Sequence, residues 1–238
     1  MRVAIMQPTY LPWCGYFGLM QSVDLFIFLD TVQFQRRSWQ QRNRIKTSNG
    51  EQWLTIPVKS KGKRNQNIQD VEIDSSTNFF KKHAKAIEIN YRQAEGFGRV
   101  FPALSLGLQS QEQMLANFTI SLLMLLRQFL GIETPVIRSS ELTGEGAKAE
   151  LLASLCLQVG ATEYVAPPGS REYMESSDVF QGTDISVRYF EFAHPQYTQL
   201  HGDFLPYMSC IDMIMNCREQ PLSLIQGNVT MRRDSENS

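Results

Sequence analysis

The sequence has few of the residues that build metal centres or disulfide frameworks. Its 238 residues include three histidines and four cysteines, and the cysteines form no CxxC pair. We therefore expect no metal site, and reduced thiols of the kind found in the cytoplasm. Walker loops, GxGxxG motifs and GxSxG elbows are also absent, so the common phosphate-loop and hydrolase signatures assign no function.

The chain also lacks an excess of charge and a long apolar run. Its formal net charge of −1 argues against a protein that coats nucleic acid or a membrane surface. The most apolar window, residues 118–130, contains Arg127 and Gln128 and is too short to span a bilayer. The first residues carry one arginine and an apolar run broken by prolines, unlike a signal peptide. These features predict a cytoplasmic protein with no nucleic-acid partner and no membrane span.

What the chain does contain is a strand–loop–helix–strand unit at its start. Residues 3–6 form an apolar run that stops at Gln7 and Pro8, because proline lacks the N–H that a central strand needs. Helical spacing begins at Tyr16, and residues 25–29 are continuously apolar, as in a strand buried on both faces. Ligands of such folds bind beyond the carboxyl ends of the strands, which is where we expect the site.

The rest of the pattern predicts an α/β fold, a Rossmann-like and mostly parallel sheet with helices on both faces. We expect a single domain over residues 1–230, a helical elaboration at about 75–130, and a flexible tail at 231–238. Alternation, apolar runs and turn residues predict further strands at 52–58, 71–73, 135–138, 161–166 and 185–192. Apolar periodicity predicts helices at 79–91, 111–130, 147–159 and 209–217. On the first of these helices, His83 lies among lysines and is expected to be a half-exposed surface residue.

A basic segment follows the second strand. From position 36 to position 64 there are nine basic residues and one acidic residue, Glu51, with aromatic and amide residues between them. The cations form either a solvated face or a pocket for an anionic, phosphate-bearing ligand, for which arginine and lysine are both suited. The candidate ligand-binding residues of this segment are Gln33, Arg36, Arg37, Arg42, Asn43, Arg44 and Lys46.

Other candidate site residues follow the ends of predicted strands. Residues Gln7, Pro8, Tyr10 and Trp13 follow the first strand. Ser170 follows the strand at 161–166, either in an ordinary turn or at a helix start that holds a phosphate.

The candidate acid–base groups are Asp30, His194 and His201, with Asp203 placed to orient one of the histidines. Asp30 is the best placed of them, because it follows a strand and lies beside the basic run. Each of these groups has a structural role as its alternative.

Several segments resemble the WbqC-like family, and together they extend over nearly the whole chain. They are QPTYLPWCGYFGL, VDLFIFLDTVQFQRRSWQQRNRIKT, WLTIPV, SSEL, HPQYTQL and SCIDMIMNC. The family usually has histidine where this chain has Met6, and a Ser-Gly pair at Ala166-Pro167. Its members occur in bacterial gene clusters for O-antigen and other surface polysaccharides, so the resemblance implies a role in that biosynthesis.

The opening is also similar, more distantly, to HxGH-type nucleotidyltransferases such as pantothenate synthetase. Here Cys14-Gly15-Tyr16 occupies the place of the histidine motif that stabilises the triphosphate in those enzymes. This resemblance implies a Rossmann-like fold and a nucleotide-shaped pocket.

The first functional hypothesis is a transferase that acylates or aminoacylates a nucleotide-linked amino sugar. Its basic residues would hold the diphosphate or a phosphopantetheine, and Asp30 or His194 would take the proton of the attacking amine. The donor would be acyl-CoA or an acyl group on a carrier protein, which would then be a partner. The alternatives are a non-catalytic module that binds the nucleotide sugar or docks a synthesis enzyme, and an ATP-dependent ligase or nucleotidyltransferase.

Overall fold

The computed structural model describes residues 1–63, 65–167, 169–171, 174, 177–217 and 221–233. The strands are β1 (Arg2–Met6), β2 (Leu25–Phe28), β3 (Arg42–Thr47), β4 (Gly50–Thr55), β5 (Val136–Arg138), β6 (Glu163–Ala166), β7 (Ser186–Phe192) and β8 (Val229–Arg233). The helices are α1 (Cys14–Gln21), α2 (Phe79–Tyr91), α3 (Phe97–Leu108), α4 (Leu115–Leu130), α5 (Ala149–Gln158), α7 (Cys210–Asn216) and α8 (Pro221–Gln226). Short 3-10 helices are η1 (Ile68–Asp70), η2 (Ser139–Glu141) and η3 (Asp178–Phe180).

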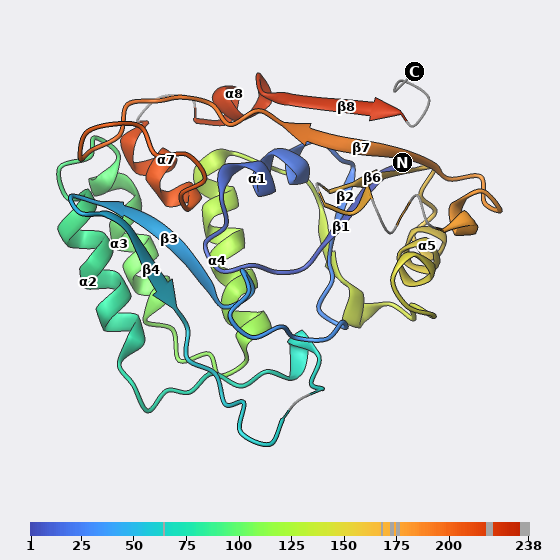
Figure 1. Cartoon of the computed structure of the whole chain (residues 1–238), viewed down its shortest axis with the longest axis horizontal. Helices are drawn as coiled ribbons and strands as arrows, with labels where there is room; N and C mark the ends of the chain where they lie inside the picture. Colours follow the sequence, from blue (N-terminus) through green and yellow to red (C-terminus); the bar gives the residue numbers. More distant parts are fainter. Residues whose placement is uncertain (64, 168, 172–173, 175–176, 218–220, 234–238) are drawn as a thin grey trace.

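Six strands form one sheet in the order β5-β2-β1-β6-β7-β8 (Figure 1). All neighbouring pairs are parallel except β7 and β8, which are antiparallel. The chain moves from β1 to β2 on one side and later returns to β6 on the other side of β1. The boundary between β1 and β6 is therefore the topological switch point, where the loops after the two strands diverge. The α/β, Rossmann-like prediction is confirmed.

The two faces of the sheet pack against different helices because successive side chains of a strand point to opposite faces. Ala4 and Phe26 belong to a core cluster that includes residues of α1, α4 and α7. Val3 and Ile27 belong to a second cluster, which includes residues of α5. Figure 1 shows α1 and α4 to the left of the central strands β1 and β2, and α5 to their right.

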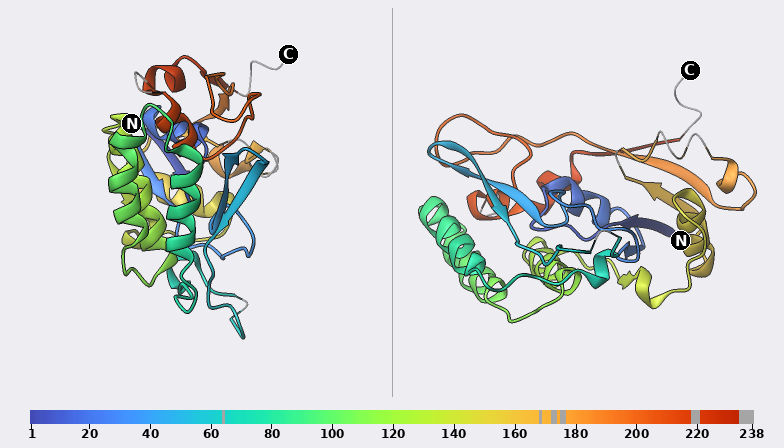
Figure 2. Two further views of the ribbon diagram at one scale, coloured as in Figure 1. Left: turned by 90° about the vertical axis from the view of Figure 1, so that its left-hand side faces the viewer. Right: turned by 60° about the horizontal axis from the view of Figure 1, so that its bottom comes forward.

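The chain between β2 and β5 builds the part of the molecule outside the main sheet. Strands β3 and β4 form a separate antiparallel hairpin that contacts α2 and α7. Helices α2, α3 and α4 pack side by side, as the two views of Figure 2 show. None of the helices in the described part of the chain combines the length and the apolar character that crossing a bilayer requires.

Four details differ from the sequence analysis. The basic segment at 42–47 is strand β3, which the sequence did not predict. Residues 71–73 make only isolated bridges, with positions 58 and 114, instead of a regular strand. Residues 231–233, assigned to the tail, pair with β7 in β8, and the remaining tail, 234–238, lies outside the described residues.

The fourth difference is His83, for which the predicted half-exposed position is wrong. Its side chain is 6% exposed, and its Nδ1 lies 2.8 Å from the Tyr10 hydroxyl. The rings of Phe79 and Tyr10 pack against the imidazole. The lysines that flank His83 in sequence are exposed whereas His83 itself is buried, so the neighbours in sequence indicated the wrong environment.

Candidate functional site

Two adjoining cavities lie beyond the carboxyl ends of β1 and β6, at the switch point of the sheet. The first, about 300 Å³, is here called the aromatic cavity, and its lining includes Trp13, Tyr16, Trp39, Asn43, Arg44 and Tyr207. The second, about 280 Å³, is here called the amide cavity, and its lining includes Gln7, Gln35, Ser38, Gln40 and Pro167 together with the apolar Ile5, Leu29 and Leu152. Met6, Thr9 and Trp39 line both cavities. The position agrees with the general rule for ligand sites in open α/β sheets.

Stacked rings and an arginine form one wall of the aromatic cavity. Trp39 stacks on Trp53 with ring centroids 5.4 Å apart, and the Arg44 guanidinium lies 5.6 Å from the Trp39 ring. Arg44 also donates to both carboxylate oxygens of Glu51, at 2.7 and 2.8 Å. Its charge is therefore already paired, and its contribution to a ligand is a flat cationic surface beside two indoles. Such a wall suits a planar ring, because an aromatic side chain can stack on the face of any base.

The other predicted cationic residues make different kinds of contact. Lys46 is 3% exposed, and its Nζ donates to the carbonyl oxygens of Gly202 and Asp203. Arg42 stacks on Trp53 at 4.3 Å from the ring centroid. Arg36 and Arg37 are exposed in the turn between Gln35 and Ser38, both of which line the amide cavity. The structure thus places Arg44 in the lining of the aromatic cavity and Arg36 and Arg37 next in sequence to lining residues of the amide cavity, whereas Lys46 holds a loop.

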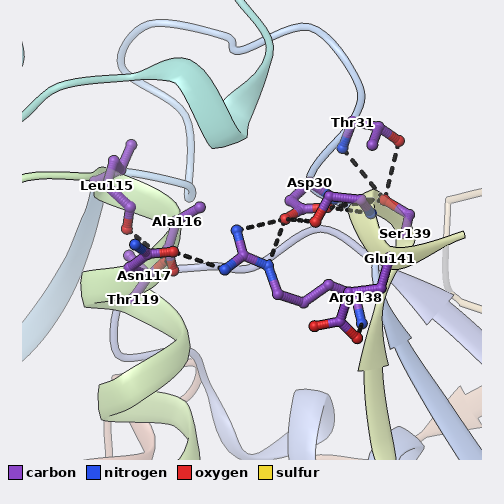
Figure 3. A network of polar contacts seen from close by, with 10 residues as sticks. Asp30, Thr31, Leu115, Ala116, Asn117, Thr119, Arg138, Ser139 and Glu141 are labelled. Atoms are coloured by element: carbon purple, nitrogen blue, oxygen red, sulfur yellow. Dashed lines mark hydrogen bonds and ion pairs between the residues drawn. The ribbon is translucent and has the colours of Figure 1, made fainter.

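Asp30 is fully buried in a saturated polar network at the ends of β2 and β5 (Figure 3). Its Oδ2 accepts from Arg138 Nε at 2.7 Å and from the Ser140 hydroxyl at 2.9 Å. Its Oδ1 accepts from the Ser139 hydroxyl and the Ser140 N–H, both at 3.0 Å. Arg138 in turn donates to Asn117 of α4. Asp30 therefore joins two strand ends to a helix, and its carboxylate has no vacant oxygen for an attacking amine.

His194 lies behind the wall of the aromatic cavity. Its ring stacks on Trp13 with centroids 6.2 Å apart, and its Nε2 lies 3.6 Å from the Cys14 Sγ. Since a carbonyl can only accept, the contact of Nδ1 with the Pro195 oxygen at 2.9 Å leaves Nε2 as the acceptor toward the thiol. Burial lowers the pKa of His194 and raises the pKa of Cys14 to about 12, so both are neutral near pH 7.

His201 and His194 do not form the pair that their spacing suggested. His201 is exposed, and its Nε2 lies 2.8 Å from the Asn90 carbonyl oxygen. Asp203, predicted to orient one of the histidines, instead accepts a hydrogen bond from Lys46 Nζ through its backbone oxygen. Neither histidine nor Asp30 is among the described residues that line the two cavities. Within the described chain, no group of three or more His, Cys, Asp and Glu side chains is arranged to hold a metal ion.

The remaining predicted residues mostly support the walls. Tyr10 is fully buried, and its carbonyl accepts from the Asn43 side chain at 3.1 Å. Pro8, two positions before Tyr10, is also buried. Gln33 is exposed and forms an isolated β-bridge with residue 67. Ser170 is 2% exposed, and its hydroxyl donates to the Pro167 carbonyl at 2.7 Å, so it closes a turn.

Sequence reasoning missed Thr9, Tyr207 and Gln40 as site residues. Thr9 is 9% exposed, lines both cavities, and its hydroxyl has no hydrogen-bond partner in the described structure. Gln40 was visible in the sequence as one of the amides between the cations. Tyr207 lies in a loop in which no sequence motif indicated a binding residue. Trp39 was likewise visible as one of the aromatic residues of the basic segment.

Comparison with known proteins gives a family and one curated relative. The family model described as the WbqC-like protein family matches residues 7–223. The chain is 40% identical over 217 residues to a Mycobacterium tuberculosis (strain ATCC 25618 / H37Rv) protein named "Uncharacterized protein Rv1507c", covering 90% of this chain and 93% of that protein. No solved structure matches the chain. The chain belongs to the WbqC-like protein family.

Proposed function

We propose that this protein is a transferase that acylates or aminoacylates the amino group of a nucleotide-linked sugar in surface-polysaccharide, or O-antigen, biosynthesis. The observation that carries the proposal is the pair of joined cavities at the switch point, one lined largely by aromatic rings and the other by three glutamine amides among apolar side chains. A nucleotide sugar has the same division, with a flat base at one end and hydroxyl and phosphate groups beyond it. The resemblance to WbqC-like proteins supports the choice of this pathway.

Catalysis in this proposal rests on positioning. The base stacks on Trp39, and the diphosphate and sugar occupy the amide cavity near Arg36 and Arg37. The sugar amine attacks the carbonyl carbon of an acyl thioester, a C–N bond forms, and the C–S bond breaks to release a thiol. The donor is acyl-CoA or an acyl group on a carrier protein. Holding amine and carbonyl together supplies the main rate enhancement. His194, predicted from the sequence as a candidate base, lies behind Trp13 on the side of the aromatic cavity, so in this arrangement the proton of the attacking amine passes to the departing thiolate.

A second candidate is a non-catalytic module that binds a nucleotide sugar or docks a protein of the same pathway. One observation favours it: Asp30, the carboxylate best placed by sequence, has both oxygens occupied by hydrogen-bond donors. The module uses the same cavities as the transferase. The two candidates therefore differ in turnover and agree on the ligand.

A thermal-shift panel of nucleotide sugars, nucleotides, acyl-CoAs and ATP tests the proposal. A ligand that binds only the folded state at about a hundred times its Kd stabilises the protein by roughly 2.7 kcal/mol, which a melting curve resolves. We expect a nucleotide sugar to raise the Tm, and Trp39→Leu to abolish the shift. Leu106→Ala, which removes an apolar side chain that is 75% exposed on α3, is the control.

The outcomes separate the candidates. A nucleotide-sugar shift together with product from an acyl-CoA supports the transferase. The same shift without transfer from any acyl donor favours the binding module. A shift with ATP alone contradicts both and favours a ligase.

A further inference from the structure

Gln7 is the first residue beyond β1, at the switch point, and its half-buried side chain lines the amide cavity. Its backbone oxygen accepts from the Tyr16 hydroxyl at 3.2 Å, which fixes the main chain there. The end of β1 is the centre of the sheet, between β2 and β6. The amide of Gln7 thus occupies the most central polar position of the site, and which of its ends faces the cavity decides what it can bind.

A relay of hydrogen bonds decides that orientation. The Gln35 N–H can only donate, so the atom of Gln40 that it contacts at 3.0 Å must be the Oε1. The other end of the Gln40 amide is then the Nε2, which donates to Gln7 at 2.7 Å. A donor requires an acceptor, so Gln7 turns its Oε1 toward Gln40. The Nε2 of Gln7 is left as a double donor that makes no hydrogen bond to the described residues.

Other buried amides of the region have both ends occupied. Gln41 accepts from the Arg37 N–H and donates to the Ile56 carbonyl. Asn43 accepts from the Arg44 N–H and donates to the Tyr10 carbonyl. These amides hold loops in place. Gln7 differs because its acceptor end is fixed by Gln40 while its donor end remains available to a ligand.

The charge around this donor favours an anionic acceptor. Arg36 and Arg37 are exposed in the turn between Gln35 and Ser38, two lining residues, and neither makes an ion pair within the described chain. No carboxylate is among the described residues that line either cavity. Charge-assisted hydrogen bonds from N–H groups to phosphate oxygens are among the strong ones in proteins.

We infer that Gln7 is a phosphate-recognition residue: its Nε2, oriented by the Gln35–Gln40 relay, donates to a phosphate oxygen of the nucleotide-linked ligand. Arg36 and Arg37 supply the long-range positive charge, and Gln7 supplies the short directional contact. The inference rests on the proposed function for the identity of the ligand. Beyond that function, the inference names the atom that binds the phosphate oxygen and explains why this atom is a donor.

The test reverses the polarity of this one group. Gln7→Glu still accepts from Gln40, so the relay survives, but it presents a carboxylate oxygen to the cavity instead of an N–H. The probes are the nucleoside diphosphates of uridine, thymidine, guanosine and cytidine, each compared with its own nucleoside by calorimetry. We expect the diphosphate that binds the wild type to bind Gln7→Glu about 100-fold more weakly, because a charge-assisted bond is replaced by repulsion. Binding of the nucleoside is expected to change by less than about threefold, because the stacking wall is untouched.

One further variant controls for the added charge, a second tests the relay, and an NMR signal reports on Gln7 in the wild type. Gln111→Glu adds the same charge on an exposed position before α4 and is expected to leave binding unchanged. Gln40→Glu removes the donor of the relay and allows Gln7 to turn its Nε2 toward the new carboxylate, so binding is expected to fall without any change at Gln7. In the wild type, the side-chain ¹⁵N amide signal of Gln7, assigned from the wild-type backbone resonances, is expected to shift with the diphosphate and not with the nucleoside.

The results separate this inference from the proposed function. A wild type that binds neither nucleotides nor nucleotide sugars overturns the proposed function and this inference with it. Diphosphate binding that is equally strong in Gln7→Glu, or no stronger than nucleoside binding in the wild type, overturns the inference alone. A Gln7 amide signal that ignores the diphosphate does the same, even where a variant fails to fold.

Discussion

Two aspartates, Asp30 and Asp212, are both fully buried, yet they are accommodated in different ways. Asp30 accepts from the Arg138 guanidinium and from serine groups of the β5–η2 segment. Asp212 of α7 accepts only from uncharged side chains in the described structure, which are Tyr91, Tyr197, Gln199 and Asn216. Burial raises the pKa of Asp212, against the opposing effect of these donors.

The two regions differ in the donors that compensate a buried carboxyl group. At the sheet edge a charge pair ties the ends of β2 and β5 to α4, and removing one partner leaves the other charge without compensation. Beneath the helices, neutral donors join α7 to α2 and to the loop of Tyr197 and Gln199. His83 of α2 follows the second pattern, since burial lowers its pKa to about 4 and keeps the ring neutral. Three variants test how far this contrast holds.

The largest effect is expected for Arg138→Met, which keeps the apolar stem and removes the cation. Asp30 would remain 0% exposed without a countercharge, and breaking such a buried pair costs about 3–5 kcal/mol. Urea unfolding at pH 7 measures the loss. The double variant Asp30→Asn with Arg138→Met is the control and is expected to lose less than the single variant. A loss below about 1 kcal/mol for the single variant would show that Asp30 does not depend on its cation.

The next effect concerns His83 and acid. The folded pKa of about 4 lies below the ordinary value of 6.5, so the unfolded chain binds more protons between these limits and stability is lost as pH falls from 6.5 through 4. A shift of this size corresponds to about 3 kcal/mol at the acid end. Denaturant unfolding at a series of pH values measures the slope. His83→Gln lacks the titrating ring, and an equal slope in that variant would assign the acid loss to other groups.

The smallest effect is expected for Asp212→Asn, at about 1–2 kcal/mol near pH 7, because one acceptor oxygen becomes an N–H₂ group among hydroxyls. Its pH dependence has the opposite sign to that of His83. The raised pKa means that the folded chain binds more protons, so the stability contributed by Asp212 falls as pH rises through its folded pKa. Subtracting the stability profile of Asp212→Asn from that of the wild type isolates this slope. A flat difference would mean that Asp212 keeps its charge at little cost.

Local signals in the sequence were enough for much of the fold. The apolar runs at 3–6 and 25–29, the proline after the first, and the long periodic segment ending at Gly131 gave elements close to those observed. Gly131 has a φ of 69°, the left-handed conformation that glycine adopts at helix ends without steric cost. The WLTIPV signal gave β4 within a few residues, but its partner β3 is rich in charge and was read as a binding segment.

The order of residues along the chain shows that polar and aromatic groups follow the first strand and that cations cluster after the second. It could not determine which of them meet. Asp30 faces Arg138 and two serines more than a hundred positions away, and His83 is buried by Tyr10 from the first loop. Burial and pairing depend on contacts between distant segments, and no local periodicity records them. The orientation of the Gln7 amide likewise depends on Gln40, so the assignment of its Oε1 as the engaged end required the folded chain, in which residues 7, 35 and 40 meet.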